Sequence, residues 1–143
     1  MAIRTASAEW KGGLRGGTGS FSGTSGHVDG NYSFQSRFEE NGATNPEELV
    51  AAAHASCFSM FLAGVLEQEG NPAESVRTEA KVQILKVGEG FEITKIDLTT
   101  VARVPGIDDA ALQKAAQTSK ENCPISKALG AVSEMNVDAT LES

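Results

Sequence analysis

Hydrophobic and polar positions alternate along two neighbouring stretches of this chain. Between residues 76 and 84, and again between residues 91 and 100, apolar or β-branched side chains recur at every second position, the period of a β-strand. The alternation slips by one residue at Thr94-Lys95, which predicts a bulge in the second strand. A third alternating run, over residues 135–141, predicts a last strand.

The first 40 residues also predict β-strands, interrupted by glycine. Eight of the fifteen glycines lie between Gly12 and Gly30, so the backbone there must turn tightly or pass close to other groups. Asp29-Gly30 predicts a hairpin turn. The alternation of aromatic and polar residues from Tyr32 to Phe38 predicts a strand with Arg37 on its polar face.

Helix signals follow these strands. Asn45 is a good cap and Pro46 suits a first helical position, while Glu48 can complete a capping box with Asn45. A helix is therefore predicted from about residue 46 to residue 69, where a Gly-Asn-Pro segment ends it. Its segment Leu49–Leu66 is apolar on nearly every face, so other elements must cover it.

Two shorter helices are predicted in the C-terminal part. Asp108 can cap a helix that runs to about Asn122, and a second begins at Pro124 and ends before Gly130. Strands, a long helix, a hairpin, helices and a strand together predict an α+β fold, with helices packed on antiparallel sheet. At this length, and with 40% hydrophobic residues, the chain is expected to form one domain over residues 1–143.

Charge and segment lengths limit the partners. The net charge is −7 and no basic run occurs, which argues against nucleic acid and acidic membrane surfaces. The first residues lack the apolar stretch of a secretory signal, so a cytoplasmic protein is expected. Segment Leu49–Leu66 contains His54, Ser56 and Ser59 and has acidic flanks, which favours a buried helix over a membrane span.

The chain has two cysteines, in unlike surroundings. Cys57 lies in the apolar helix, where burial raises a thiol pKa and where inert packing is the commoner role. Cys123 directly precedes Pro124, so it occupies a helix cap whose unpaired N–H groups favour an anionic sulfur. In the cytoplasm stable disulfides are uncommon, so two such thiols suggest a redox pair.

Two charged residues could activate Cys57. A guanidinium from Arg37 beside the sulfur would favour the thiolate, and the Glu47 carboxylate could hold that guanidinium through paired hydrogen bonds. Each also has a simpler interpretation: Arg37 as a solvated strand residue, and Glu47 as charge–dipole stabilisation of a helix start.

A metal site is the competing use of the cysteines. His54 lies three residues before Cys57 on nearly the same helix face, and Cys123 and His27 could add ligands. Their spacing matches no standard zinc pattern, so we expect no metal, and a core or interface histidine is the favoured role of His54.

Several motifs resemble the osmotically inducible protein C (OsmC) family. The stretch from Arg37 to Met60, with His-Ala-Ser-Cys-Phe-Ser-Met around Cys57, is similar to it, and so is the segment Asn122-Cys123-Pro124-Ile125-Ser126. Together with Glu9-Trp10 and Val104-Pro105-Gly106-Ile107, the resemblance spans essentially the whole chain. The chain resembles the OsmC branch more than the organic hydroperoxide resistance branch, whose arginine comes from the glycine-rich region. Here that region offers Arg15 as a second candidate.

The resemblance implies a fold, an activity and a site. It implies an OsmC-like fold, with antiparallel sheets around a long buried central helix, in an intertwined homodimer with two interface sites. It implies a thiol peroxidase without metal, haem, flavin or other cofactor, recycled by a lipoyl-type dithiol or other thiol. Cys57 would be the peroxidatic cysteine, Cys123 the resolving cysteine, and Arg37 with Glu47 the activating pair. The apolar neighbours of Cys57 favour organic hydroperoxides over hydrogen peroxide.

Helix geometry constrains this site. Glu47 and Cys57 are ten residues apart, or about 15 Å along one straight helix. Either the helix breaks between them, or a second chain supplies one partner, as in an obligate dimer. Two other functions stay open: a non-enzymatic hydrophobic-ligand-binding protein with redox-sensing thiols, and a structural disulfide domain.

Overall fold

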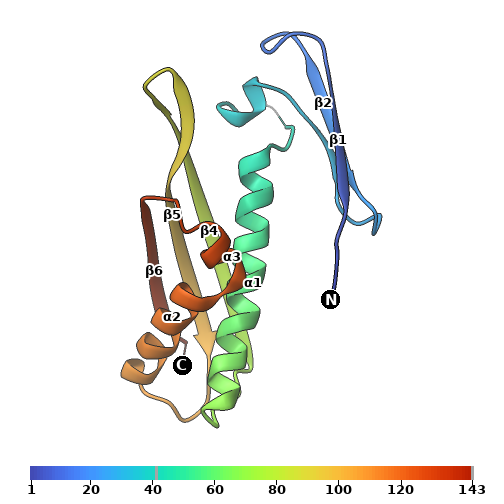
Figure 1. Ribbon diagram of the computed structural model, residues 1–143. Coiled ribbons are helices and arrows are strands. Elements are labelled where there is room, and N and C mark those ends of the chain that lie inside the picture. Colours follow the sequence, from blue (N-terminus) through green and yellow to red (C-terminus); the bar gives the residue numbers. More distant parts are fainter. Residues whose placement is uncertain (41, 143) are drawn as a thin grey trace. The chain divides into compact units, whose positions relative to one another are not determined.

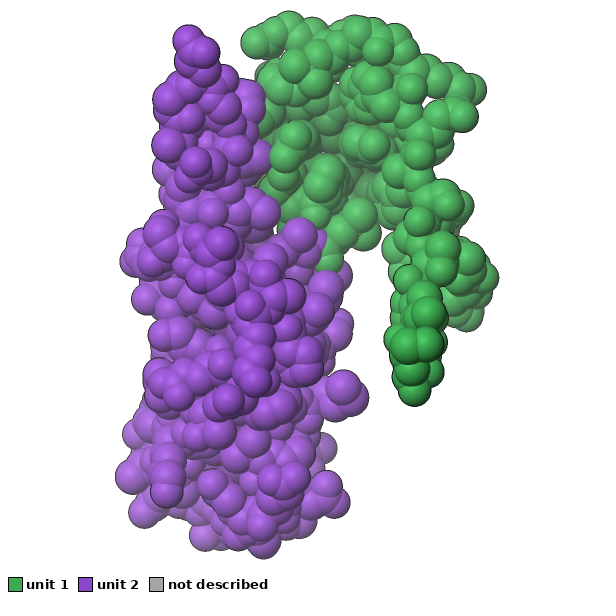
Figure 2. Space-filling view, in the orientation of Figure 1, with its two compact units in different colours: residues 1–49 green, residues 50–143 purple. Residues whose placement is uncertain are grey.

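The computed structural model describes residues 1–40 and 42–142, which form two compact units. One unit covers Met1–Leu49 and the other the chain from Val50 onward (Figure 2). The elements, in chain order (Figure 1), are β1 (Ala6–Lys11), β2 (Thr18–Gly23), β3 (Asp29–Tyr32), the 3-10 helix η1 (Gln35–Arg37), α1 (Pro46–Gln68), β4 (Ser75–Val87), β5 (Gly90–Arg103), α2 (Asp109–Asn122), α3 (Pro124–Ala128) and β6 (Glu134–Leu141). The predicted single domain over residues 1–143, whose positions 41 and 143 lie outside the described residues, stays a prediction.

The first unit is built on a small antiparallel sheet in the order β1-β2-β3. The ring of Tyr32 packs 5.6 Å from that of Trp10 and 6.1 Å from that of Phe21, measured between centroids. Gly19 passes so close beneath these rings that a Cβ there would lie 2.5 Å from Tyr32 and 2.8 Å from Trp10. The glycine-rich run therefore serves close backbone approach, one of its two expected uses.

The hairpin turn predicted at Asp29-Gly30 is wrong, because both residues lie inside β3. The chain turns earlier, between β2 and β3, and Gly30 pairs with Phe21 across the sheet. A Cβ at Gly30 would lie 2.9 Å from both the Phe21 ring and the Thr44 methyl group. The glycine is there for packing, and the local Asp-Gly signal could not reveal that long-range reason.

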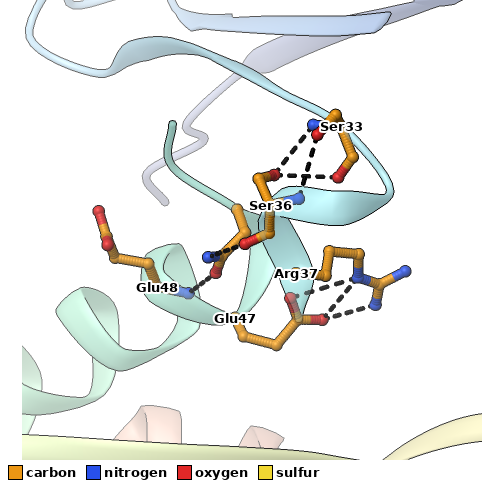
Figure 3. Close-up of polar contacts among 6 residues, drawn as sticks. Ser33, Ser36, Arg37, Glu47 and Glu48 are labelled. Atoms are coloured by element: carbon orange, nitrogen blue, oxygen red, sulfur yellow. Dashed lines mark hydrogen bonds and ion pairs between the residues drawn. The ribbon is translucent and has the colours of Figure 1, made fainter. Parts of the chain in front are cut away.

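The strand predicted from Tyr32 to Phe38 is also wrong beyond Tyr32, where the chain forms η1. Two serines impose the turn by exchanging hydrogen bonds (Figure 3). The N–H of Ser33 donates to Ser36 Oγ at 2.9 Å, and the N–H of Ser36 donates to Ser33 Oγ at 3.0 Å. Serine side chains that satisfy nearby backbone groups compete with strand pairing, and here they override the period-two pattern.

The second unit contains a sheet in the order β4-β5-β6. Strands β4 and β5 form a long antiparallel hairpin. Gln83 pairs with Lys95 while Ile84 pairs with Ile93, so Thr94 is the extra residue of a bulge. The bulge predicted at Thr94-Lys95 is confirmed.

One strand departs from the expected antiparallel sheets: β6 pairs parallel with β5. The chain leaves the end of β5, passes through α2 and α3, and returns at Glu134 opposite Lys95. A helical crossover of this kind brings the next strand back in the same direction, whereas a tight turn would reverse it. The alternating pattern of residues 135–141 is the same in either direction, so sequence alone could not distinguish a parallel from an antiparallel strand.

The predicted helices are confirmed. Asn45 Oδ1 accepts the N–H of Glu48 at 2.7 Å at the start of α1, and the Glu48 carboxylate accepts the Thr44 hydroxyl at 2.9 Å. Asp108 caps α2 by accepting the N–H of Ala111 at 2.9 Å.

Helix α1 supplies one stripe of the second unit's core. His54, Phe58, Leu62 and Leu66, spaced by four residues, are fully buried. The three apolar members, Phe58, Leu62 and Leu66, belong to a core completed mainly by β5 and α2 (Ile96, Leu98, Ala102, Leu112, Ala115 and Ala116). The side chain of Met60 is exposed. Helix α1 is long and apolar enough to pass for a membrane span by length and composition. Within the second unit its fully buried side chains form one stripe, against the expectation of a helix buried all round.

Candidate active site

The first charged group of interest is the ion pair of Arg37 and Glu47, within the first unit (Figure 3). Arg37 stands at the end of η1 and Glu47 in the first turn of α1. The Arg37 Nε–H donates to both carboxylate oxygens at 3.1 and 3.3 Å, and Nη2 donates to Oε1 at 2.5 Å. Glu47 is buried and Arg37 is one-third exposed. A buried carboxylate thus orients a cation whose outer side remains available for a ligand.

Asn45 explains why this pair forms. Its Nδ2–H donates to the Ser36 carbonyl at 2.8 Å while its Oδ1 caps α1. One side chain therefore ties η1 to the first turn of α1, and so brings Arg37 to Glu47. From the sequence, Asn45 was predictable only as a helix cap. The Ser-x-x-Ser spacing of Ser33 and Ser36 was the available signal for the turn.

Beside Arg37 lies a cavity of about 170 Å³ with an aromatic lining. Its walls, all in the first unit, are Trp10, Leu14, Tyr32, Ser33, Phe34, Arg37 and Pro46. Arg15, the second candidate for activation, places its guanidinium 4.9 Å from the Phe34 ring centroid. Arg15 thus contacts an aromatic face, whereas Arg37 is held by a carboxylate.

The two cysteines meet in the second unit. Cys57 Sγ on α1 lies 3.1 Å from Cys123 Sγ at the start of α3. Both are free thiols; Cys123 is fully buried and Cys57 is partly exposed. Since a disulfide bond is about 2.05 Å long, a movement of about 1 Å would link the sulfurs. The arrangement supports reversible disulfide chemistry.

The two thiols differ in acidity. Burial raises the pKa of Cys57, and the adjacent Cys123 thiol raises it further, against the opposing effect of the Ile125 N–H. Burial also raises the pKa of Cys123, but the N–H of Ser126, the Cys57 thiol, the Ser126 hydroxyl and the Ile125 N–H outweigh it and lower the pKa overall. Among the described residues, the Cys123 side chain accepts no capping hydrogen bond, so the first-turn N–H groups act on its sulfur as dipoles.

His54 lies beside this pair. Its Nε2 is 2.7 Å from Ser126 Oγ, and burial lowers its pKa, which favours the neutral imidazole. Among residues 1–40 and 42–142, no group of three or more His, Cys, Asp or Glu side chains is arranged to hold a metal ion. His54 was predicted to be a core or interface residue, whereas no local pattern indicated Ser126 as its partner.

The continuity of α1 tests whether the helix breaks between Glu47 and Cys57. The helix runs without interruption from Pro46 to Gln68, so the predicted option of a break between Glu47 and Cys57 is wrong. Supply of one partner by a second chain stays a prediction.

The chain matches the OsmC-like protein family over residues 39–138. It belongs to the OsmC family. It is 43% identical over 137 residues to peroxiredoxin OsmC of Escherichia coli (strain K12), covering 95% of this chain and 94% of that protein. It is 35% identical over 100 residues to organic hydroperoxide resistance protein OhrA of Bacillus subtilis (strain 168), covering 70% and 67%.

Solved OsmC-family structures share the fold. The crystal structure of an organic hydroperoxide resistance protein OsmC from Legionella pneumophila superposes with a TM-score of 0.70 at 25% identity, over 100% of both chains. The α+β OsmC-like fold and the family predicted from the two cysteine motifs are confirmed. The longer and stronger match to peroxiredoxin OsmC agrees with the predicted OsmC branch.

Proposed function

We propose that this OsmC-family protein is a thiol-dependent peroxidase that reduces organic hydroperoxides, and hydrogen peroxide more weakly. The observation that carries the proposal is the 3.1 Å separation of Cys57 Sγ and Cys123 Sγ. Relatives named peroxiredoxin OsmC and organic hydroperoxide resistance protein support the peroxidase class. An apolar neighbourhood favours organic peroxides, because only these have a tail that gains by leaving water.

The reaction follows from the two sulfurs. The Cys57 thiolate forms an S–O bond to the outer peroxide oxygen, the O–O bond breaks, and the departing alkoxide takes a proton to become the alcohol. Cys57 is left as a sulfenic acid. The Cys123 thiolate then attacks the Cys57 sulfur, hydroxide leaves and takes a proton to become water, and a disulfide results. A lipoyl-type dithiol or other thiol supplies two electrons and two protons to restore both thiols, in the cytoplasm.

Activation of Cys57 requires a cation. Within the described part of the second unit, the groups that shift the Cys57 pKa are the Cys123 thiol and the Ile125 N–H, and neither is a cation. We propose a homodimer in which the Arg37–Glu47 pair of one subunit serves Cys57 of the other. Two observations support this arrangement: α1 is unbroken between Glu47 and Cys57, and the second unit fully buries one stripe of its side chains.

Arg37→Gln and Glu47→Gln are each expected to lower kcat/KM for an organic hydroperoxide by about a hundredfold, since an ion-paired cation near a thiolate shifts its pKa by about 1–3 units. The measurement is initial peroxide consumption with excess dithiothreitol. Arg103→Gln is the matched control, because Arg103 makes a comparable ion pair with Glu142 at 3.3 Å on the surface. Equal losses in Arg37→Gln and Arg103→Gln would contradict the assignment.

Mixed dimers test which subunit supplies the pair. Cys57→Ser chains are co-expressed with Arg37→Gln chains to give heterodimers. If each site joins Cys57 of one subunit to Arg37 of the other, a heterodimer has one intact site. If each site lies within one subunit, a heterodimer has no intact site. About a quarter of wild-type activity is then expected from random pairing in a closed dimer. No recovery of activity in purified heterodimers, or a monomeric mass at micromolar concentration, would rule the arrangement out.

Thiol titration tests the function itself. Reduced protein is mixed with increasing cumene hydroperoxide or hydrogen peroxide, free thiols are counted, and linked peptides are mapped by mass spectrometry. We expect both thiols to disappear together, in a Cys57–Cys123 disulfide, with less cumene hydroperoxide than hydrogen peroxide. Thiols that survive both oxidants would instead favour the hydrophobic-ligand-binding function.

A further inference from the structure

Two contacts join α1 to the start of α3, and the residues that make them are three apart on each helix. His54 and Cys57 lie three residues apart on α1, and Cys123 and Ser126 lie three residues apart at the N-terminus of α3. His54 Nε2 contacts Ser126 Oγ at 2.7 Å, one helical turn from the contact of the two sulfurs at 3.1 Å. Residues three apart on a helix share a face, so the polar contact lies beside the sulfur contact.

This polar contact is sealed from solvent. His54 is 0% exposed, Ser126 is 5% exposed and Cys123 is 0% exposed. A buried imidazole in an otherwise apolar stripe of α1, next to Phe58 and Leu62, costs free energy that apolar packing would not. Among the described residues its one polar partner is Ser126, which stands at the third position of α3, three residues after the cap residue Cys123 and so on the same side of the helix start.

The tautomer of His54 follows from its second nitrogen. Among the described residues, buried Nδ1 has no hydrogen-bond partner. A buried N–H without an acceptor is costly, so the neutral ring carries its proton on Nε2 and donates it to Ser126 Oγ. Because the Ser126 oxygen then accepts a hydrogen bond from His54, the Ser126 hydroxyl proton is available for donation to another acceptor.

We infer that His54 and Ser126 are positioning residues for the Cys123 sulfur: the imidazole holds the serine hydroxyl so that its proton is donated to Cys123. The hydroxyl stabilises the Cys123 thiolate before that thiolate attacks Cys57, and again when Cys123 leaves during reduction of the disulfide. Among the described residues of the second unit, the titratable groups on this side of Cys123 are the Cys57 thiol on α1 and, through Ser126, His54. Only the catalytic consequence rests on the proposed function.

The protonation of Cys123 can be measured without any peroxide. In the Cys57→Ser protein Cys123 is the one remaining thiol, so the ultraviolet absorbance of its thiolate can be followed against pH. Ser126→Ala and His54→Phe should each raise the midpoint of the titration by about one unit, because each removes donation to an anion. The double variant should raise it no further than Ser126→Ala alone, since both act through one hydroxyl.

Conservative variants separate this role from a merely structural one. Ser126→Thr keeps the hydroxyl and His54→Gln keeps an N–H donor, and both should stay within a few tenths of a unit of the parent midpoint. Ser119→Ala is the matched control, because Ser119 is equally buried and donates to Ala115 O at 2.8 Å, within α2. Its midpoint should not move.

The tautomer of His54 can be measured by nuclear magnetic resonance of its ring nitrogens. This measurement uses the unsubstituted reduced protein and needs no variant. The Nε2–H tautomer is expected from neutral to alkaline pH. Three results would each overturn the inference. The first is a proton on His54 Nδ1, and the second is an unchanged titration midpoint in Ser126→Ala. The third is a midpoint that rises in Ser126→Ala but not in folded His54→Phe. The titration is read whether or not the protein reduces peroxides, so its failure is distinct from failure of the proposed function.

Discussion

Cys57→Ser is expected to abolish hydroperoxide consumption, leaving only the uncatalysed rate. The reason is access: of the two sulfurs, Cys57 is partly exposed whereas Cys123 is fully buried. Although the pKa of Cys123 is lowered and that of Cys57 is raised, a thiolate that peroxide cannot reach does not react with it. Access therefore outweighs acidity in assigning the peroxidatic role.

The measurement is consumption of cumene hydroperoxide by the variant in the presence of excess dithiol. Ser56→Ala is the matched control, because Ser56 is exposed on the same helix and its hydroxyl donates to Ala52 O; its activity should equal that of the wild type. Circular dichroism and thermal unfolding should show that both variants are folded. Substantial turnover by Cys57→Ser would transfer the peroxidatic role to Cys123.

Cys123→Ser is expected to limit the protein to a single turnover. Cys57 still reacts once and forms a sulfenic acid, but no neighbouring thiol can displace its hydroxyl. About one equivalent of hydroperoxide should be consumed, after which further peroxide converts Cys57 to the sulfinic acid. Intact-protein mass should show one and then two added oxygens, and no Cys57–Cys123 link.

The double variant Cys57→Ser with Cys123→Ser is the control for this experiment and should take up no oxygen. Normal cycling of Cys123→Ser with a dithiol donor would mean that the external thiol resolves the sulfenic acid directly. Cys123 would then be a packing residue despite its position 3.1 Å from Cys57 Sγ.

The unequal acidity of the thiols bears on how the disulfide is reduced. In thiol–disulfide exchange the sulfur of lower pKa is the better leaving group, and here that sulfur is Cys123. Cys57 is also the more exposed sulfur, so an external dithiol is expected to attack Cys57 and release Cys123. Any change that weakens donation to Cys123 should therefore slow both closing and opening of the disulfide.

Much of the fold could be predicted because its signals are local. Asn45 and Asp108 cap their helices through contacts three residues away, and the phase slip at Thr94 marks its bulge directly. The wrong predictions fall where distant groups decide. Gly30 packs under Phe21 and Thr44, and the direction of β6 depends on its crossover from β5.

By itself, the sequence determined the helices, the long hairpin, the family and the two sulfurs, since each depends on neighbouring residues or on a motif. Only the tertiary structure decided which groups meet: Cys57 with Cys123 across 66 residues and His54 with Ser126 across 72. Local propensities cannot predict contacts between residues so far apart in the sequence. Closing a long loop is governed by the packing of the whole core rather than by the residues at its ends.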